Sequence, residues 1–99
     1  MSENILTAIA IRVLTLFLLS ENFLPDNDHE ITDYGPHRIW TVSTCVPFDM
    51  DLEALKVRFQ EYLAHHNACL TAAKFGFYDC VSYPCSHCGG QHLYLSIYQ

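Results

Sequence analysis

Two segments near the C-terminal end of this 99-residue chain alternate hydrophobic with polar residues, and this period of two constrains the fold more than any other feature. Residues 75–81 and 93–97 each place every second side chain on one face, as strands with one buried face do. The short connection between them predicts an antiparallel hairpin. The residues expected to face the core are Phe75, Phe77 and Val81 in the first strand and Leu93, Leu95 and Ile97 in the second.

Two other segments show the spacing of helices. Residues 3–22 carry apolar side chains around most of a helix, which must therefore be covered on more than one side, either by its own core or also by a second copy of the chain. Residues 49–66 predict a second, amphipathic helix with Asp49 as its N-cap. Both helices are expected to pack against a sheet.

The region between these helices predicts a loop followed by a strand. Residues 25–36 are polar and acidic and end in the turn sequence Gly35-Pro36, which indicates a loop. Residues 37–46 are rich in β-branched side chains, which favours a strand. We therefore expect a single α+β domain spanning residues 1–99, with the order α-β-α-β-β and a three-stranded antiparallel sheet that carries both helices on one face.

Charge is low overall, and eight of the 11 acidic residues fall within residues 21–53, where Arg38 is the only residue of opposite charge. Charged residues make up 16% of the chain, against about 25% in average proteins, and the formal net charge is −6. This balance argues against direct nucleic-acid binding and favours a basic protein as partner, including a nucleic-acid-binding one. The alternative is a solvated loop that only keeps the protein soluble. The acidic residues proposed to meet a partner are Asp26, Asp28, Glu30 and Asp33.

Five cysteines, an odd number, occur without the basic start of a secretory signal. Reduced thiols in the cytoplasm are the expected state. The apolar run of residues 5–19 contains Arg12 and is shorter than the roughly 20 residues that span a bilayer, so no membrane partner is expected.

Residues 84–92, Pro-Cys-Ser-His-Cys-Gly-Gly-Gln-His, contain the most specific chemical motif. A C-x-x-C turn that ends in glycine allows both sulfur atoms to face one metal ion. The Pro-Cys-x-x-Cys-Gly-Gly stretch resembles the zinc knuckle of zinc-ribbon proteins, including small phage-borne restriction-alleviation proteins. The resemblance covers residues 84–90 and implies structural zinc bound by Cys85 and Cys88. Because the second C-x-x-C of those families is missing, it implies no function.

The remaining metal ligands must come from elsewhere in the chain. One candidate set adds Cys80 and His92, which lie on either side of the C-x-x-C pair. The other adds Cys69 with His65 or His66, since residues three or four apart share a helix face. Two further interpretations need no metal: the thiols are small buried hydrophobes, or the C-x-x-C pair is a thiol-disulfide centre.

The hairpin face that points away from the helices is the expected partner-binding surface. Tyrosine combines a large contact area with a polar end and is enriched at binding hot spots. We interpret the chain as a small acidic protein-binding module, an inhibitor or adaptor that occludes its partner and forms a homodimer through the first helix. One specific form is a phage- or plasmid-type anti-defence inhibitor of a nucleic-acid-binding enzyme. The tyrosines expected on this face are Tyr78, Tyr94 and Tyr98.

A thiol-disulfide or thiol-dependent enzyme that uses Cys85 and Cys88 is the alternative function. The sequence has no phosphate-binding glycine loop and no nucleophile with an orienting residue at a recognisable spacing. Enzyme activity is therefore not expected.

Overall fold

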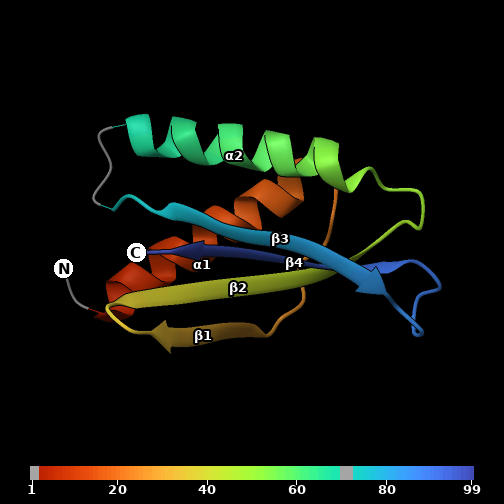
Figure 1. The fold of residues 1–99 in the computed structure, drawn as a ribbon, viewed down its shortest axis with the longest axis horizontal. Helices are drawn as coiled ribbons and strands as arrows, with labels where there is room; N and C mark the ends of the chain where they lie inside the picture. Colours follow the sequence, from red (N-terminus) through yellow and green to blue (C-terminus); the bar gives the residue numbers. More distant parts are fainter. Residues whose placement is uncertain (1–2, 70–72) are drawn as a thin grey trace.

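Two helices and four antiparallel strands are the elements of the computed structural model, which describes residues 3–69 and 73–99 (Figure 1). The predicted α+β class and antiparallel sheet are confirmed. The sheet has one strand more than predicted, and the order is α-β-β-α-β-β. In chain order the elements are α1 (Glu3–Ser20), β1 (His29–Tyr34), β2 (His37–Val46), α2 (Leu52–Ala68), β3 (Gly76–Pro84) and β4 (Gln91–Tyr98).

The strands lie in the order β1-β2-β4-β3, so β4 occupies the interior of the sheet between β2 and β3. The hairpin of β3 and β4 is the predicted one. β2, which α2 connects to this hairpin, lies on the other side of β4. β2 and β4 pair from Ile39 opposite Tyr98 to Val46 opposite Gln91. The end of β2 therefore lies beside the turn that joins β3 to β4.

The additional strand, β1, falls in the segment that the sequence indicated as a loop. It pairs with β2 from His29 opposite Val42 to Tyr34 opposite His37. The two-residue connection begins with Gly35, whose φ of 61° is a backbone conformation that glycine adopts without steric cost. All six residues of β1 are exposed, so the strand has no buried face and no hydrophobic alternation that would reveal it.

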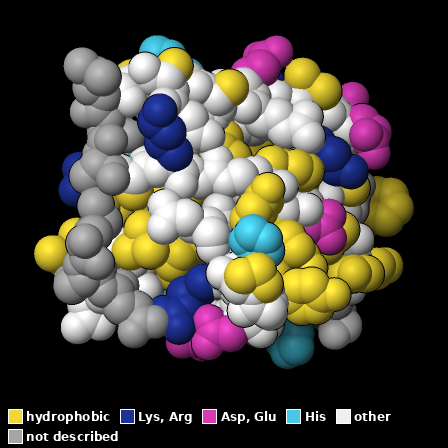
Figure 2. Space-filling model, turned by 60° about the vertical axis from the view of Figure 1, so that its left-hand side comes forward, with side chains coloured by type: hydrophobic (Ala, Val, Ile, Leu, Met, Phe, Trp, Pro, Cys, Tyr) yellow, Lys and Arg dark blue, Asp and Glu magenta, His cyan; other side chains and the backbone are white. Residues whose placement is uncertain are grey.

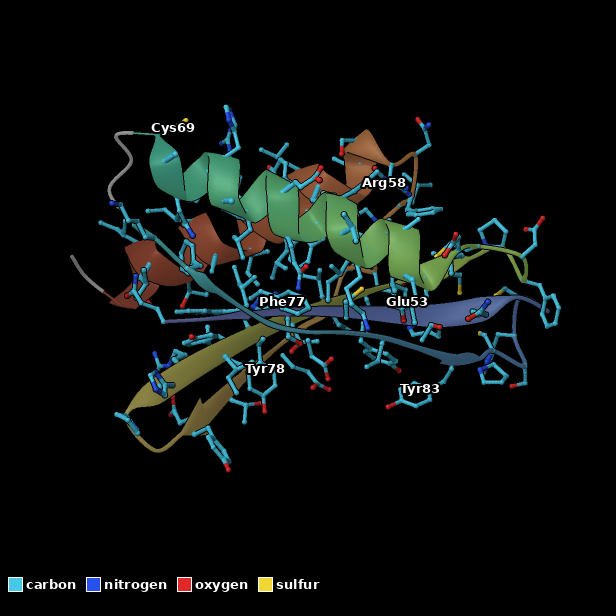
Figure 3. The ribbon with its side chains drawn as sticks, turned by 45° about the horizontal axis from the view of Figure 1, so that its top comes forward. Glu53, Arg58, Cys69, Phe77, Tyr78 and Tyr83 are labelled. Carbon is cyan, nitrogen blue, oxygen red and sulfur yellow. The ribbon has the colours of Figure 1, made fainter. Side chains whose placement is uncertain are left out.

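Both helices cover the same face of the sheet (Figure 3). The indole Nε1 of Trp40 in β2 donates a hydrogen bond to Thr7 Oγ1 of α1 at 3.2 Å. Phe77 of β3 points towards α2, where its ring centroid lies 5.8 Å from that of Phe59. Full burial of a large apolar side chain contributes about 1.5–3 kcal/mol, so this layer holds the helices on the sheet. The largest fully buried apolar side chains are Trp40, Phe59, Leu14, Leu18, Leu55, Leu93, Leu95 and Ile97.

A β-bulge at Tyr78 reverses the faces of the second half of β3. Phe77 and Asp79 pair with successive residues of β4, which leaves Tyr78 as the extra residue. Because side chains alternate along a strand, one inserted residue moves every later side chain to the opposite face. Cys80 is consequently fully buried in the core. Val81, which the alternation placed in the core, is only half-buried on the uncovered face.

The second helix begins two residues later than predicted. Pro47 O accepts a hydrogen bond from Met50 N at 3.1 Å, and this turn takes up Asp49. Asp51 is the N-cap instead, because its carboxylate accepts from Ala54 N at 3.1 Å.

The first helix keeps part of its apolar surface in contact with solvent. Its inner side chains join the core, whereas Ile5, Leu16 and Leu19 are 54%, 44% and 45% exposed. Across residues 3–69 and 73–99, neither helix is long and apolar enough to cross a membrane.

Candidate metal centre

Three cysteines from two parts of the chain meet at one end of the sheet. The Sγ atoms of Cys45, Cys85 and Cys88 all lie within 4.8 Å of one another, and those of Cys45 and Cys85 are 3.9 Å apart. Cys45 lies near the end of β2, and the other two occupy the turn between β3 and β4. Three sulfur atoms this close form a group that can bind one metal ion.

The turn is folded tightly enough to bring its two cysteines together. Cys85 N donates to Gly90 O at 3.0 Å, and Gly89 N donates to Cys85 O at 3.2 Å. Gly89 has a φ of 73°, which favours glycine. A β-carbon on Gly90 would collide with Val46 O, so the absence of a side chain there allows the turn to pack against the end of β2.

His92 approaches the sulfur atoms from the first part of β4. It is the residue directly opposite Cys45 in the pairing of β2 with β4. Its Nδ1 lies 3.5 Å from Cys45 Sγ, and its Nε2 lies 3.2 Å from Asp26 Oδ2. The same carboxylate oxygen accepts a hydrogen bond from Ser43 Oγ at 2.8 Å. The imidazole thus lies between the thiol cluster and a carboxylate that is itself held in place.

Two of the thiols, Cys85 and Cys45, have very different proton affinities. The backbone N–H groups of Cys88 and His87, followed by the Cys88 side chain and His92, lower the pKa of Cys85 to about 6. Cys45 has its pKa raised to about 12, first by its hydrogen bond to Cys88, then by desolvation and by Cys85. One thiolate is thus stabilised by neighbouring donors, while a second negative charge beside it is opposed. A divalent cation removes this opposition, because it attracts all the thiolates at once.

The cluster matches the predicted ligand set only in part. Cys85 and Cys88 come together as expected, and His92 lies beside Cys45 but outside the group whose ligand atoms are all within 4.8 Å of one another. Cys80 does not join them, because the bulge places it in the core, where burial raises its pKa to about 11. The residue that sequence reasoning missed is Cys45. Its signal was the pairing of its strand with β4, which sets it opposite His92.

The alternative ligands on the second helix lie at the other end of the molecule. Cys69 Sγ is 3.9 Å from His65 Nε2, which reproduces the predicted spacing of four residues. The ring of His66 is used differently, with its Nε2 3.0 Å from Ala73 O. Cys69 lies where α2 ends, far from the turn between β3 and β4 (Figures 1 and 3). The helix therefore does not complete the cysteine cluster.

The predicted tyrosines lie on the uncovered face of the sheet. Tyr78 points away from the helices in Figure 3, as does Tyr83, which was not among the predicted residues. The ring centroids of Tyr78 and Tyr98 are 6.5 Å apart, and those of Tyr83 and Tyr94 are 6.0 Å apart. A cavity of about 190 Å³ opens on this face, and its lining residues are Tyr34, His37, Ile39, Tyr78 and Tyr98.

The four acidic residues proposed to meet a partner have three different surroundings. Asp26 contacts His92 beside the cysteines. Asp28 and Glu30 line a smaller cavity next to Tyr94. Asp33 accepts a hydrogen bond from Arg38 Nε at 2.8 Å, so part of its charge is balanced within the chain.

Comparison with known proteins identifies no relative of this chain. No protein family, curated protein or solved structure matches this chain. Its fold and site define it as a small α+β protein with a cysteine cluster compatible with a metal ion.

Proposed function

We propose that this chain is a non-enzymatic protein-binding module that occludes or bridges a partner protein through the sheet face left uncovered by its helices. The observation that carries the proposal is the aromatic cavity on that face. Tyr34 and Tyr78 are 68% and 49% exposed beside it, although large aromatic rings gain free energy from burial. Rigid aromatic side chains around a depression are typical of binding hot spots.

A partner with a basic surface fits this face best. Asp28 and Glu30 lie next to Tyr94 on the same side of the sheet, and the chain as a whole carries a net charge of −6. Acidic groups around an aromatic centre steer a basic partner over a Debye length of about 8 Å at physiological salt. A basic nucleic-acid-binding enzyme, occluded by a protein that carries the charge of its substrate, is the specific form that we favour.

Hydrophobic side chains also form several separate groups on the side of the molecule drawn in Figure 2, with histidine, basic and acidic side chains between them. On α1, the exposed side chains of Ile5 and Leu16 line a groove of about 590 Å³. We propose a second copy of the chain as the occupant of this groove, because the helix is apolar around most of its circumference.

We further propose that the ion held by the cysteine cluster is zinc and that its role is structural. Thiolate and imidazole ligands are those that zinc prefers in structural sites. Bound there, the ion would tie the end of β2 to the turn between β3 and β4. Its contribution would be to the stability of the domain.

The lowered pKa of Cys85 favours a thiol-disulfide enzyme as the second candidate. In that reaction the Cys85 thiolate attacks an external disulfide, forms a mixed disulfide and releases one substrate thiolate. Cys88 then attacks Cys85, which releases the second substrate thiolate and leaves a Cys85–Cys88 disulfide. Reduction of a model disulfide that stops in the Cys88→Ser variant would support this candidate over the binding module.

Site-specific photocrosslinking in cells tests the binding module. Benzoylphenylalanine replaces Tyr78 on the uncovered face, and in the matched control it replaces Val57, which is similarly exposed on α2. We expect one defined crosslinked protein from position 78 and none from position 57. The yield of crosslinking in extracts should fall steeply with added salt and in the Asp28→Asn, Glu30→Gln double variant. Equal yields from both positions, or no product from position 78, would exclude this surface.

A further inference from the structure

We infer that His92 is the fourth ligand of a Cys3His metal site and that Asp26 positions its imidazole ring. This inference rests on the proposed zinc site and names its complete set of ligands. Two of them, Cys45 and His92, face each other across β2 and β4, and the other two lie in the turn that begins where β3 ends. The ligand atoms are the sulfur atoms of Cys45, Cys85 and Cys88 and the Nδ1 atom of His92.

Two of the distances between these atoms are close to those of a tetrahedron around zinc, whereas His92 lies outside the group whose ligand atoms are all within 4.8 Å of one another and would have to move closer to complete the site. With Zn–S of about 2.3 Å and Zn–N of about 2.0–2.1 Å, two sulfur ligands are separated by about 3.8 Å and a sulfur and a nitrogen by about 3.6 Å. The sulfur atoms of Cys45 and Cys85 are 3.9 Å apart, and Cys45 Sγ lies 3.5 Å from His92 Nδ1. Both separations are therefore already close to those that the ion requires.

The other ring nitrogen of His92 has the partner that metal-binding histidines usually have. A ligating imidazole almost always donates its second N–H to a carboxylate or a carbonyl group, which fixes both tautomer and orientation. Asp26 Oδ2 lies 3.2 Å from His92 Nε2. With the proton on Nε2, the lone pair of Nδ1 is free to face Cys45 Sγ, 3.5 Å away.

Asp26 is itself fixed by two hydrogen bonds to the neighbouring strand. Its carboxylate accepts from Ser43 Oγ at 2.8 Å, and its backbone N–H donates to Ser43 O at 2.8 Å. Ser43 lies in β2 two residues before Cys45, so the carboxylate and one sulfur ligand are anchored to the same strand. This arrangement places an acidic residue of the connecting segment beside the imidazole that faces the cysteine cluster.

Titration of the metal-free protein with Co²⁺ tests the inference, because tetrahedral cobalt reports on its ligands by absorption. We expect His92→Gln to weaken binding by more than 100-fold and to change the ligand-field bands, since a nitrogen ligand is lost. Asp26→Asn should keep the spectrum and weaken binding about 10- to 100-fold, as changes to outer-shell partners do. The matched controls are His29→Gln and Asp49→Asn, which change exposed residues of the same types and should bind Co²⁺ as the native protein does.

The outcomes separate this inference from the zinc site on which it rests. If the native protein binds neither Co²⁺ nor Zn²⁺, the zinc site is wrong. If it binds Co²⁺ with a thiolate spectrum that His92→Gln leaves unchanged, the zinc site stands and the assignment of His92 is wrong. Nitrogen-15 spectra of the Zn²⁺-bound protein give a further readout: a metal-bound Nδ1 and a protonated Nε2 support the inference, and an unbound Nδ1 overturns it.

Discussion

The close contact of Gly90 with the end of β2 predicts that one added methyl group will separate the turn from the sheet. In Gly90→Ala the new β-carbon would collide with Val46 O and lie 3.4 Å from Phe48 N. Both atoms belong to the backbone, and Val46 is buried and paired with β4, so neither can rotate aside as a side chain would. Overpacking costs about 1–3 kcal/mol, and a backbone neighbour places this substitution at the upper end. We expect a loss of about 3 kcal/mol, which lowers Tm by about 12–24 °C in a domain of this size.

Urea unfolding, followed by circular dichroism in the presence of a chelator, measures this loss separately from metal binding. The matched control is Gly89→Ala in the same turn, where an added β-carbon meets no atom within 4 Å but φ is +73°. Only the left-handed backbone is then penalised, by about 1–2 kcal/mol. If the free energy of unfolding of Gly90→Ala lies within about 0.5 kcal/mol of that of the native protein, the tight packing of the turn on β2 is refuted.

Three other outcomes follow from the structure. With Zn²⁺ at 100 times its dissociation constant, the free energy of unfolding of the native protein should rise by about 2.7 kcal/mol. In thermal unfolding, Cys45→Ser should lose this stabilisation and Cys69→Ser should keep it. In the metal-free protein, alkylation followed by mass spectrometry should modify Cys85 well before Cys45. Because the pKa of Cys85 is lowered to about 6, the rate of its alkylation should rise as the pH passes through that value and level off above it. Equal alkylation rates for the two cysteines would contradict the stabilised Cys85 thiolate. Asp51→Ala should destabilise the domain by about 1 kcal/mol in urea unfolding, whereas Asp49→Ala should have almost no effect.

Most of the fold could be predicted because its elements bury one face and so carry a hydrophobic period. The two helices and the β3–β4 hairpin have such a period, and each was recognised. The strand β1 has none, since its six residues are all exposed, and only the turn at Gly35 marked its end. The bulge at Tyr78 depends on how β3 pairs with β4, which the alternation of a single strand does not contain.

The candidate site could be predicted only as far as its ligands are close in sequence. Cys85 and Cys88 share one turn, and His92 follows a few residues later. Cys45 lies 40 residues before Cys85, and only the register of β2 against β4 brings the two together. The same reasoning placed Cys80 wrongly, because the extra residue at Tyr78 turns it to the other face.

The exposed strand β1 also bears on how this protein resists aggregation with other copies of itself. β1 pairs with β2 alone in the described part of the chain, so its outer backbone groups form an open edge of the sheet. Such an edge is a template on which another strand can add, and charged side chains are a common protection against this. If two copies of β1 paired with each other, Glu30 and Asp33 of one copy would lie close to the same acidic residues of the other copy and repel them. The edge thus disfavours growth of the sheet into aggregates, while a strand with basic side chains would meet no such repulsion.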